Sequence, residues 1–402
     1  MNRAMKDSGI PWIGKIPKDW NVNLIGSCIK EVDCKNTNCN EDNALQFKMG
    51  TIISKRNGDS KYNPETLEAY NIVKVGDIII NGLNLSFDLI SQRVGLVKEN
   101  GVITSTYIAV RPTTNICNEF LTYLFKAYDN CKAFHSMGRG LRQTLSYGEL
   151  RKYYVVLPFK EEQQRIAEFL DRKCGEIDEA IALQEEFIEE LKSYKQSFIT
   201  EAVTRGLNPN VKFKDSGIDW IGEIPEGWEC DRLKALFILH RGFDLANEDF
   251  KNAGVPVYGS GGFMGYHNEV KVKAPNIIIG RSGSTGKLHY VETDFWAHNT
   301  GIYVSESRGN KMRYLYYLLL AVDLESLSTK TAVPTLDRKK VQEHRFVFTK
   351  DVIEQQQIAD YLDNKCSEID SLIAIKQQKI EELKDYKKSI IYEYVTGKKE
   401  VE

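Results

Sequence analysis

Apolar side chains recur at spacings of three and four residues along two long stretches of the chain, residues 162–204 and 354–396. Spacings that sum to seven are typical of a coiled-coil seam on a long helix, and polar residues inside such a seam fix its register. The pattern therefore predicts two long helices that are each other's partner. The seam positions are Leu170, Cys174, Ile177, Ile181, Ile188, Leu191, Phe198 and Ala202, then Leu362, Cys366, Ile369, Ile373, Ile380, Leu383, Ile390 and Tyr394, with polar interruptions at Gln184, Lys195, Lys376 and Lys387.

The two stretches are copies of each other, with 26 of 43 positions identical. A second repeat confirms the duplication, because Lys6–Trp20 returns as Lys214–Trp228 with 11 of 15 positions identical. The offset is 208 residues between the short motifs and 192 between the helices, so the second interior is 16 residues shorter. The order of short motif, variable interior and long helix thus occurs twice.

Each interior has the pattern of a small α+β domain. Short apolar runs between turn residues predict strands, and apolar residues at helical spacing predict helices at Glu119–His135 and Met312–Val322. The polar segment Cys28–Asp42 indicates a loop. The expected strands are Asp77–Ile80, Val94–Val97, Tyr107–Val110 and Tyr153–Leu157 in the first interior, and Asn276–Gly280, Lys287–Val291, Gly301–Val304 and Phe346–Phe348 in the second.

The expected fold is therefore α+β, with two globular domains joined by two long antiparallel coiled-coil helices in an internal pseudo-two-fold repeat. The expected boundaries are 1–158 for the first domain with its short motif, 159–207 for the central helix, 208–350 for the second domain with its motif, and 351–402 for the C-terminal helix.

The 402 residues suffice for two domains with real cores, and no apolar run is long enough to span a bilayer. With nothing that resembles a signal peptide, we expect a soluble, cytoplasmic protein. Eight cysteines are scattered without metal-ligand spacing, and Cys174 and Cys366 fall on the helix seams. We therefore expect free thiols, as in a reducing compartment.

The net charge of −2 hides an asymmetry along the chain. Residues 161–206 carry 12 acidic and 6 basic side chains, and residues 353–402 carry 11 acidic and 8 basic ones. The remainder of the chain therefore has a net charge of +7. Basic interiors and acidic helices are expected if only the interiors meet phosphate, although glutamate-rich helix surfaces give the same asymmetry.

Motifs for catalysis are missing from the sequence. A DNA adenine methyltransferase needs an Asn/Asp-Pro-Pro-aromatic motif for the flipped base, and the chain has no Pro-Pro dipeptide. The segment Arg281–Lys287 departs from a phosphate loop, because Arg281 replaces the first glycine and Leu288 replaces the Ser/Thr that binds magnesium. The six histidines show no i, i+4 pair. We therefore expect a protein that is not an enzyme and holds no metal.

Several of these motifs resemble those of the specificity subunits of Type I restriction–modification systems. The matching segments are Ser8-Gly-Ile-Pro-Trp-Ile-Gly14, Ser216-Gly-Ile-Asp-Trp-Ile-Gly222, the Glu-Gln-Gln-x-Ile-Ala openings of both helices, and Gly259-Ser-Gly-Gly-Phe-Met-Gly-Tyr266. The family's helix opening follows a proline, which Pro158 supplies in the first copy; Lys350 stands there in the second, so a different start is expected for the second helix. The first interior lacks the Gly-Gly-x-x-Gly-Tyr segment.

The resemblance implies a DNA-binding subunit without a catalytic site, in which each interior is a target-recognition domain for double-stranded DNA. It also implies two methyltransferase subunits that dock on the helices and supply the S-adenosylmethionine site, and a translocating nuclease subunit in the full complex. No cofactor is expected in this chain itself, and no membrane partner.

Base recognition needs polar and cationic side chains at turns that can enter a groove. Asn299 is of interest because Asn pairs with adenine, and it lies beside His298. The candidates in the first interior are Lys55, Arg56, Asn57, Arg139, Arg142 and Gln143, and those in the second are Tyr258, Ser260, Arg281, Ser282, Ser284, Thr285, Lys287, His298, Asn299, Lys330, Thr331 and Arg338.

The hypothesis from sequence is recognition of two different half-sites separated by a gap whose length the helix pair sets. The main alternative is a coiled-coil scaffold whose interiors bind protein rather than DNA. Salt dependence discriminates the two, because a protein that contacts phosphates must bind DNA with a steep dependence on salt.

Overall fold

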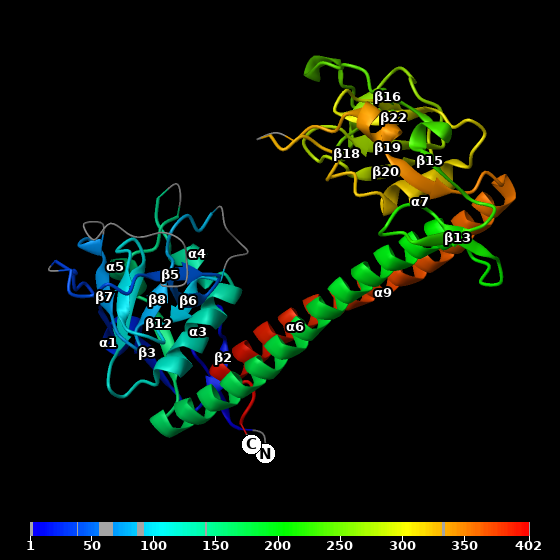
Figure 1. Ribbon diagram of the computed structural model, residues 1–402. Coiled ribbons are helices and arrows are strands. Elements are labelled where there is room, and N and C mark those ends of the chain that lie inside the picture. Colours follow the sequence, from blue (N-terminus) through cyan, green and yellow to red (C-terminus); the bar gives the residue numbers. More distant parts are fainter. Residues whose placement is uncertain are drawn as a thin grey trace. The chain divides into compact units, whose positions relative to one another are not determined.

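The computed structural model describes residues 3–37, 39–55, 67–86, 92–140, 143–331 and 334–401 (Figure 1). It divides into two compact units, one of residues 1–184 with 378–402 and the other of residues 185–377. Each unit contains one globular domain and one half of each long helix. The division expected from the sequence has four segments, because it treats each domain and each long helix separately. That division stays a prediction.

The first unit is built from the short N-terminal strands, a small mixed domain and halves of the two long helices. Its elements are β1 Met5–Asp7, β2 Lys15–Pro17, β3 Asn21–Leu24, α1 Ile25–Cys28, β4 Ile29–Glu31, β5 Leu45–Lys48, β6 Thr51–Ser54, β7 Asn71–Val73, β8 Ile78–Ile80, β9 Val94–Leu96, β10 Gly101–Ile103, β11 Ile108–Pro112, α3 Asn118–Asn130, α4 Ala133–Met137, α5 Tyr147–Leu150, β12 Tyr154–Leu157, the first part of α6 Lys160–Arg205 and the last part of α9 Val352–Val395.

A four-stranded antiparallel sheet of order β4-β11-β8-β9 forms the centre of this domain. Successive residues of a strand point to opposite faces. Ile78 and Ile80 join the core around helix α3, whereas Ile79 joins a second core with Val73 and Ile103. Both faces of the sheet are therefore covered, which explains why β8 is apolar at every position.

The second unit repeats this plan. Its elements are the last part of α6, β13 Phe213–Asp215, β14 Glu223–Pro225, β15 Glu229–Arg232, η2 Leu233–Ala235, β16 Ile238–Arg241, η3 Asn247–Asp249, β17 Val255–Gly259, β18 Gly262–His267, β19 Asn276–Gly280, β20 Leu288–Val291, β21 Trp296–Ala297, β22 Gly301–Glu306, α7 Met312–Ala321, α8 Arg338–Glu343, β23 Arg345–Phe348 and the first part of α9.

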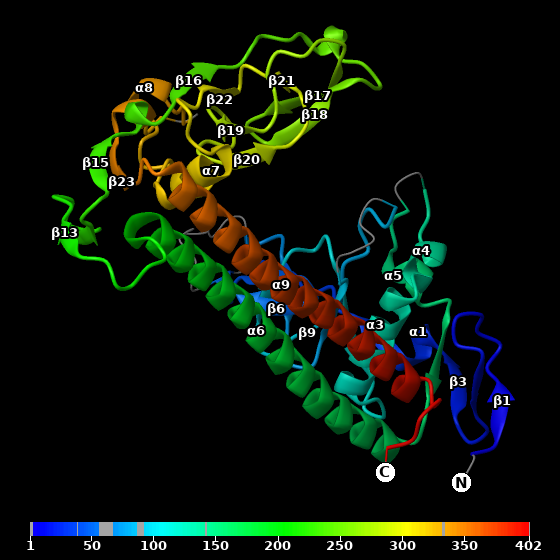
Figure 2. The same cartoon turned by 90° about the vertical axis from the view of Figure 1, so that its right-hand side faces the viewer.

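The central sheet of the second unit has the order β16-β22-β19-β20, and a three-stranded sheet β18-β17-β21 lies beside it (Figure 2). Ile277 and Ile279 of β19 pack in the core that holds helix α7. Ile278 between them packs in a separate core with Val291 and Phe295. The mixed helix and sheet content confirms the expected α+β class for this domain and for its counterpart.

Three expectations about local structure are corrected. Part of Cys28–Asp42 is strand β4 rather than loop, because the buried Ile29 and the pairing with β11 place it at the sheet edge. The helix expected at Glu119–His135 is interrupted after Asn130, where Lys132 has a φ of +60°. The second long helix begins at Val352, at the same place in the repeat as Lys160. No proline is needed there, because the Asp351 carboxylate accepts a hydrogen bond from the Ile353 N–H at 2.8 Å.

Within each unit the two long helices pack antiparallel, as the seams predict. In the first unit, Phe169 of α6 meets Tyr394 of α9, and in the second, Phe198 of α6 meets Tyr361 of α9. Two of the four polar interruptions, Lys195 and Lys387, pair with carboxylates. Lys387 pairs with Asp178 at 2.6 Å in the first unit, and Lys195 pairs with Asp370 at 2.6 Å at the equivalent place in the second.

The seam cysteines occupy equivalent places in the two units. Cys174 and Cys366 are buried free thiols, and burial raises the pKa of each. These thiols are therefore packing groups of the seam, as the sequence predicts.

The short repeated motif joins the ends of the two long helices. The Trp20 indole N–H donates to Glu162 in the first turn of α6 at 3.3 Å, and its ring lies against Gly397 at the end of α9. In the second unit, the Trp228 indole donates to Glu354 in the first turn of α9 at 3.0 Å. Its ring lies against Gly206 at the end of α6. Each motif thus fastens the start of one long helix to the end of the other.

The first Gln of each Glu-Gln-Gln sequence connects a long helix to its domain. Gln163 accepts from the Cys117 N–H, at the start of α3, and donates to the Pro158 carbonyl. Gln355 accepts from the Lys311 N–H, at the start of α7, and donates to the Thr349 carbonyl. Both side chains are buried. The repeated sequence therefore encodes a repeated attachment between helix and domain.

Candidate nucleic-acid interface

The topology of the second unit gathers several loops at one end of its central sheet. Because neighbouring strands are antiparallel, β16 and β19 end where β20 and β22 begin. The registers Gly280↔Gly301 and Ile279↔Leu288 place these ends side by side. We call the described residues at this end, 241–244, 258–264, 280–287 and 297–300 with 328–331 and 334–337, the loop cluster of the second unit.

Glycines allow these loops to approach one another closely. A Cβ on Gly280 would lie 1.9 Å from the Ser284 carbonyl oxygen, and one on Gly242 would lie 2.1 Å from the His298 carbonyl oxygen. Neither distance is compatible with a side chain. The glycine-rich character of these turns thus reflects the packing of loop against loop.

Hydrogen bonds around Thr300 fix the cluster further. Its Oγ1 accepts from the Ser260 N–H at 3.2 Å and lies 2.9 Å from His298 Nδ1. The Arg281 N–H donates to the Thr300 carbonyl at 2.8 Å, and the Thr285 hydroxyl donates to the Pro334 carbonyl at 2.9 Å. The polar side chains of the cluster therefore project from a rigid backbone.

Two histidines, His298 in the cluster and His289 in the adjacent strand β20, are half-buried. Burial lowers the pKa of His298 and of His289, whose Nε2 lies 3.2 Å from the Ser260 carbonyl oxygen. The Thr300 N–H donates to His298 Nδ1, so this ring nitrogen is unprotonated. His298 serves here as an acceptor that orders the loop.

Two cations of the cluster are available to a ligand. Within the described ranges, the side chains of Arg281 and Lys287 have no hydrogen-bond or ion-pair partner, and Lys287 is exposed. Several cations elsewhere in the unit are paired, for example Lys234 with Glu343 and Lys273 with Asp294. An unpaired cation beside hydroxyl groups is the arrangement expected for contact with phosphate or a base edge.

The remaining candidates of the second unit divide into two groups. Arg338 donates to the Leu239 carbonyl at 2.9 Å, and Asn299 donates to the Asp244 carboxylate, so each has a partner within the protein. Lys330 and Thr331 are exposed. The cluster also includes Tyr258, Ser260, Ser282, Ser284 and Thr285, which are exposed or half-buried.

The first unit has a comparable end of its sheet, where β4 and β8 end and β9 and β11 begin. The Leu145 N–H donates to the Gly82 carbonyl, so the segment that carries Arg139 and Gln143 lies against the loop after β8. The Leu336 N–H makes the equivalent bond to Arg281 in the second unit. The two segments thus hold equivalent places.

The candidates of the first unit are less concentrated. Arg139 is exposed and pairs with Glu149 at 3.1 Å, and Gln143 has a φ of +44°. The Lys55 N–H donates to the Ala44 carbonyl, so Lys55 lies at the open end of the β5–β6 hairpin. The turn of this hairpin, Met49–Gly50, is at the opposite end and lies against Gln92. Arg56, Asn57 and Arg142 lie outside the described residues.

Some residues of the interface were missed from the sequence. Thr300 organises the cluster, and Asp244 holds Asn299 and pairs with Arg241 at 2.7 Å. The sequence gives little indication of the roles of Thr300 and Asp244, because both roles depend on contacts between segments far apart in the chain. A glycine directly after a strand, as at Gly242, was the one available clue.

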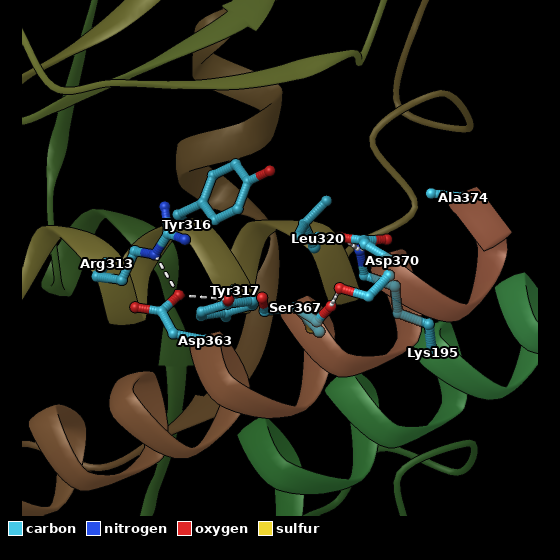
Figure 3. A pocket seen from close by; sticks show the side chains of 11 residues that line it. Lys195, Arg313, Tyr316, Tyr317, Leu320, Asp363, Ser367, Asp370 and Ala374 are labelled. Atoms are coloured by element: carbon cyan, nitrogen blue, oxygen red, sulfur yellow. Dashed lines mark hydrogen bonds and ion pairs between the residues drawn. The ribbon is translucent and has the colours of Figure 1, made fainter.

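A second surface of the second unit lies where α7 meets the long helices (Figure 3). A pocket of about 480 Å³ lies there, beside the Arg313–Asp363 ion pair of 2.6 Å and the Lys195–Asp370 pair. The Tyr317 hydroxyl donates to the same Asp363 carboxylate at 2.5 Å. Burial and this bond raise the pKa of Tyr317.

The equivalent surface of the first unit keeps part of this chemistry. The Tyr123 hydroxyl donates to Asp171 at 2.7 Å, and burial and this bond raise the pKa of Tyr123. Leu320 lines the pocket of the second unit, and the equivalent residue of the first unit is Lys126. Burial and the charge of Lys387 lower the pKa of Lys126. The two helix surfaces therefore share the tyrosine–aspartate hydrogen bond and differ in their charged side chains.

The described residues bring together no group of three or more His, Cys, Asp and Glu side chains that could hold a metal ion. No helix in the described part of the chain has both the length and the apolar character needed to cross a membrane.

The family model for the Type I restriction modification DNA specificity domain matches residues 17–193 and 225–385. The chain belongs to this family. Its two matched regions correspond to the two repeats, and together they span most of the sequence. The resemblance stated from the short motifs and helix openings is thereby confirmed.

Curated relatives agree over nearly the full length. The Type I restriction enzyme MjaVIII specificity subunit of Methanocaldococcus jannaschii is 23% identical over 414 residues, covering 96% of this chain and 94% of that one. The MjaIX specificity subunit of the same organism is 25% identical over 445 residues, covering 97% and 96%.

Solved structures share the fold. A structure described as the structural basis of complex assembly and conformational transition of the type I R-M system has a TM-score of 0.72 at 14% identity, covering 95% of this chain and 99% of that one. The HsdS subunit from Thermoanaerobacter tengcongensis has a TM-score of 0.51 at 16% identity, covering 95% and 98%. At these identities the likeness establishes the fold alone.

Proposed function

We propose that this specificity-family chain recognises a two-part, gapped, asymmetric DNA sequence, with one half-site contacted by each domain. The loop cluster of the second unit is the observation that carries the proposal. It combines a rigid backbone, exposed hydroxyl groups and the unpaired cations Arg281 and Lys287. The two interiors differ in length and sequence, so the two half-sites differ as well.

The chain acts as a non-catalytic subunit. Two methyltransferase subunits dock on the quasi-equivalent helix surfaces and bring S-adenosylmethionine, and restriction subunits complete the assembly. The repeated frame supports this part of the proposal, because Tyr123–Asp171 and Tyr317–Asp363 present the same hydroxyl–carboxylate pair in each unit.

The first experiment is co-expression with the candidate methyltransferase subunit, followed by mapping of methylated adenines in the host DNA. The proposal expects a gapped motif with two unlike halves. A complex that forms but methylates no gapped motif would contradict it.

The cations of the loop cluster give a sharper test. The Arg281→Ala/Lys287→Ala variant of the methyltransferase complex is expected to bind target DNA about tenfold more weakly per cation removed, and to lower the salt slope by about two. The reason is that each lost cation removes one contact to a DNA phosphate. Titration of a labelled duplex at several salt concentrations measures both quantities.

The matched control is Lys234→Ala/Lys273→Ala, which removes the same charge from the same unit. Both control lysines are paired with carboxylates and lie beside the starts of β16 and β19, at the opposite end of the sheet. Equal loss in both double variants would indicate a general charge effect. Binding without salt dependence in the wild type would favour the protein scaffold.

A further inference from the structure

An irregularity in the β17–β18 hairpin brings two large apolar side chains to the surface together. Val257 pairs with Gly265 and Tyr258 pairs with Phe263, so Met264 is an extra residue that has no partner in the register. Phe263 is 54% exposed and Met264 is 46% exposed. In a regular strand, adjacent side chains point to opposite faces; a bulge changes their direction, and bulges are common beside functional sites.

Both side chains are held by close packing. The Phe263 ring meets Tyr266 edge-on at 5.1 Å and Tyr258 at 6.1 Å. The Met264 sulfur lies 2.4 Å from the point that a Cβ on Gly259 would occupy, so the thioether fills the space beside that glycine. Because this packing restrains both exposed side chains, ordering them on binding costs little further entropy.

This surface belongs to the loop cluster. The Thr300 hydroxyl lies 2.7 Å from the same point beside Gly259, which places it next to the Met264 sulfur. Thr300 in turn binds the Ser260 and Arg281 backbone. The apolar pair therefore lies beside the Thr300 hydroxyl and in the same group of loops as the cations Arg281 and Lys287, and a negatively charged, groove-forming ligand matches these surroundings.

We infer that Phe263 and Met264 recognise the C5 methyl group of a thymine in the second half-site. The inference rests on the proposed function and names one determinant of its specificity. In the major groove the thymine methyl is the one apolar group at a base edge, and side-chain apolar contact is how proteins recognise it. Neighbouring polar and cationic side chains supply the contacts to phosphates and to other base edges.

The test starts from the gapped motif of the wild-type methyltransferase complex. Duplexes are made in which each thymine of the second half-site, on either strand, is replaced in turn by deoxyuridine, which lacks the methyl group. One replacement is expected to weaken wild-type binding about fourfold, the value for one buried methyl. The Phe263→Ala/Met264→Ala complex is expected to bind the thymine and deoxyuridine duplexes equally.

The methylation map supplies an independent readout. The double variant is expected to relax the second half-site at one position, where thymine is no longer required, while the first half-site stays unchanged. Val270→Ala serves as the control, because it removes exposed apolar surface from the same unit outside the hairpin. It is expected to keep both half-sites and the full discrimination against deoxyuridine.

The outcomes separate the inference from the proposed function. If the wild type yields a gapped motif but no deoxyuridine replacement in the second half-site weakens binding, the inference is wrong and the proposed function stands. Loss of the methyltransferase from the double variant would show that the apolar pair binds protein instead. Absence of any gapped motif in the wild type would reject the proposed function itself.

Discussion

At the scale of single residues, the structure gives a physical reason for the repeated Glu-Gln-Gln sequence. The Gln355 amide is fully buried and has three partners, the Lys311 N–H, the Thr349 carbonyl and the Asn310 side chain. Gln356, the next residue, is exposed, and its side chain donates a hydrogen bond to Asp360 on the same helix. Two identical side chains in sequence thus have opposite environments.

Replacing the buried amide leaves polar groups without partners. Gln355→Ala is expected to lower the free energy of unfolding by about 3 kcal/mol, because unpaired buried donors and acceptors cost about 1–3 kcal/mol each. Gln356→Ala makes the same change in helix propensity and is expected to stay within about 0.5 kcal/mol. Urea unfolding followed by circular dichroism compares the two. Equal losses of stability in the two variants would show that the change in helix propensity, and not the loss of the Gln355 hydrogen bonds, is responsible.

At the scale of elements, the loop cluster depends on glycines at points of backbone contact. Gly280→Ala would place a methyl group 1.9 Å from the Ser284 carbonyl, so the loop after β19 must move. We expect at least about a tenfold loss of affinity for the target, confined to recognition of the second half-site. Binding to duplexes altered in one half-site at a time measures this. Unchanged recognition would contradict a role of this loop at the interface.

A glycine in open space provides the control. Gly175 lies within α6, and a Cβ there would meet no atom within 4 Å. Gly175→Ala is therefore expected to stabilise the helix by about 0.5–1 kcal/mol and to leave DNA recognition unchanged. The pair of variants separates steric disruption from the loss of glycine as such.

The elements show how far sequence patterns reach. The apolar run Asn276–Gly280 and the heptad spacing predict a strand and two long helices, because burial imposes period and composition locally. The bulge at Met264 and the bond between Asp244 and Asn299 depend on tertiary register, which no local pattern contains. The sequence therefore predicts which turns carry polar groups, whereas the structure is needed to tell which groups are already used within the protein.

At the scale of the whole molecule, duplication is the feature that made the fold predictable. The offset of 192 residues relates the Lys195–Asp370 pair to the Lys387–Asp178 pair, so one sequence repeat is reflected in two identical ion pairs. The interiors are not duplicated in sequence, and their candidate residues could be placed on turns but not assigned to contacts. The frame of the molecule was thus predictable from repetition, and the specificity of each interior was not.

The same duplication allows the hypothesis about the gap to be tested. Deleting residues 182–188 and 374–380 removes one heptad from the middle of each long helix at equivalent positions, and it keeps the seams in phase. Each helix becomes shorter by about 10 Å, so the gap between half-sites is expected to shorten by at most about three base pairs, with both half-sites unchanged. Mapping methylated adenines for the deletion complex measures the gap directly. A two-residue deletion in each helix is the control, because at 3.6 residues per turn it rotates the apolar stripe by about 200°, away from its partner, and should abolish the complex rather than change the gap. Altered half-site sequences in the heptad deletion would contradict the hypothesis, because the helices would then influence recognition itself.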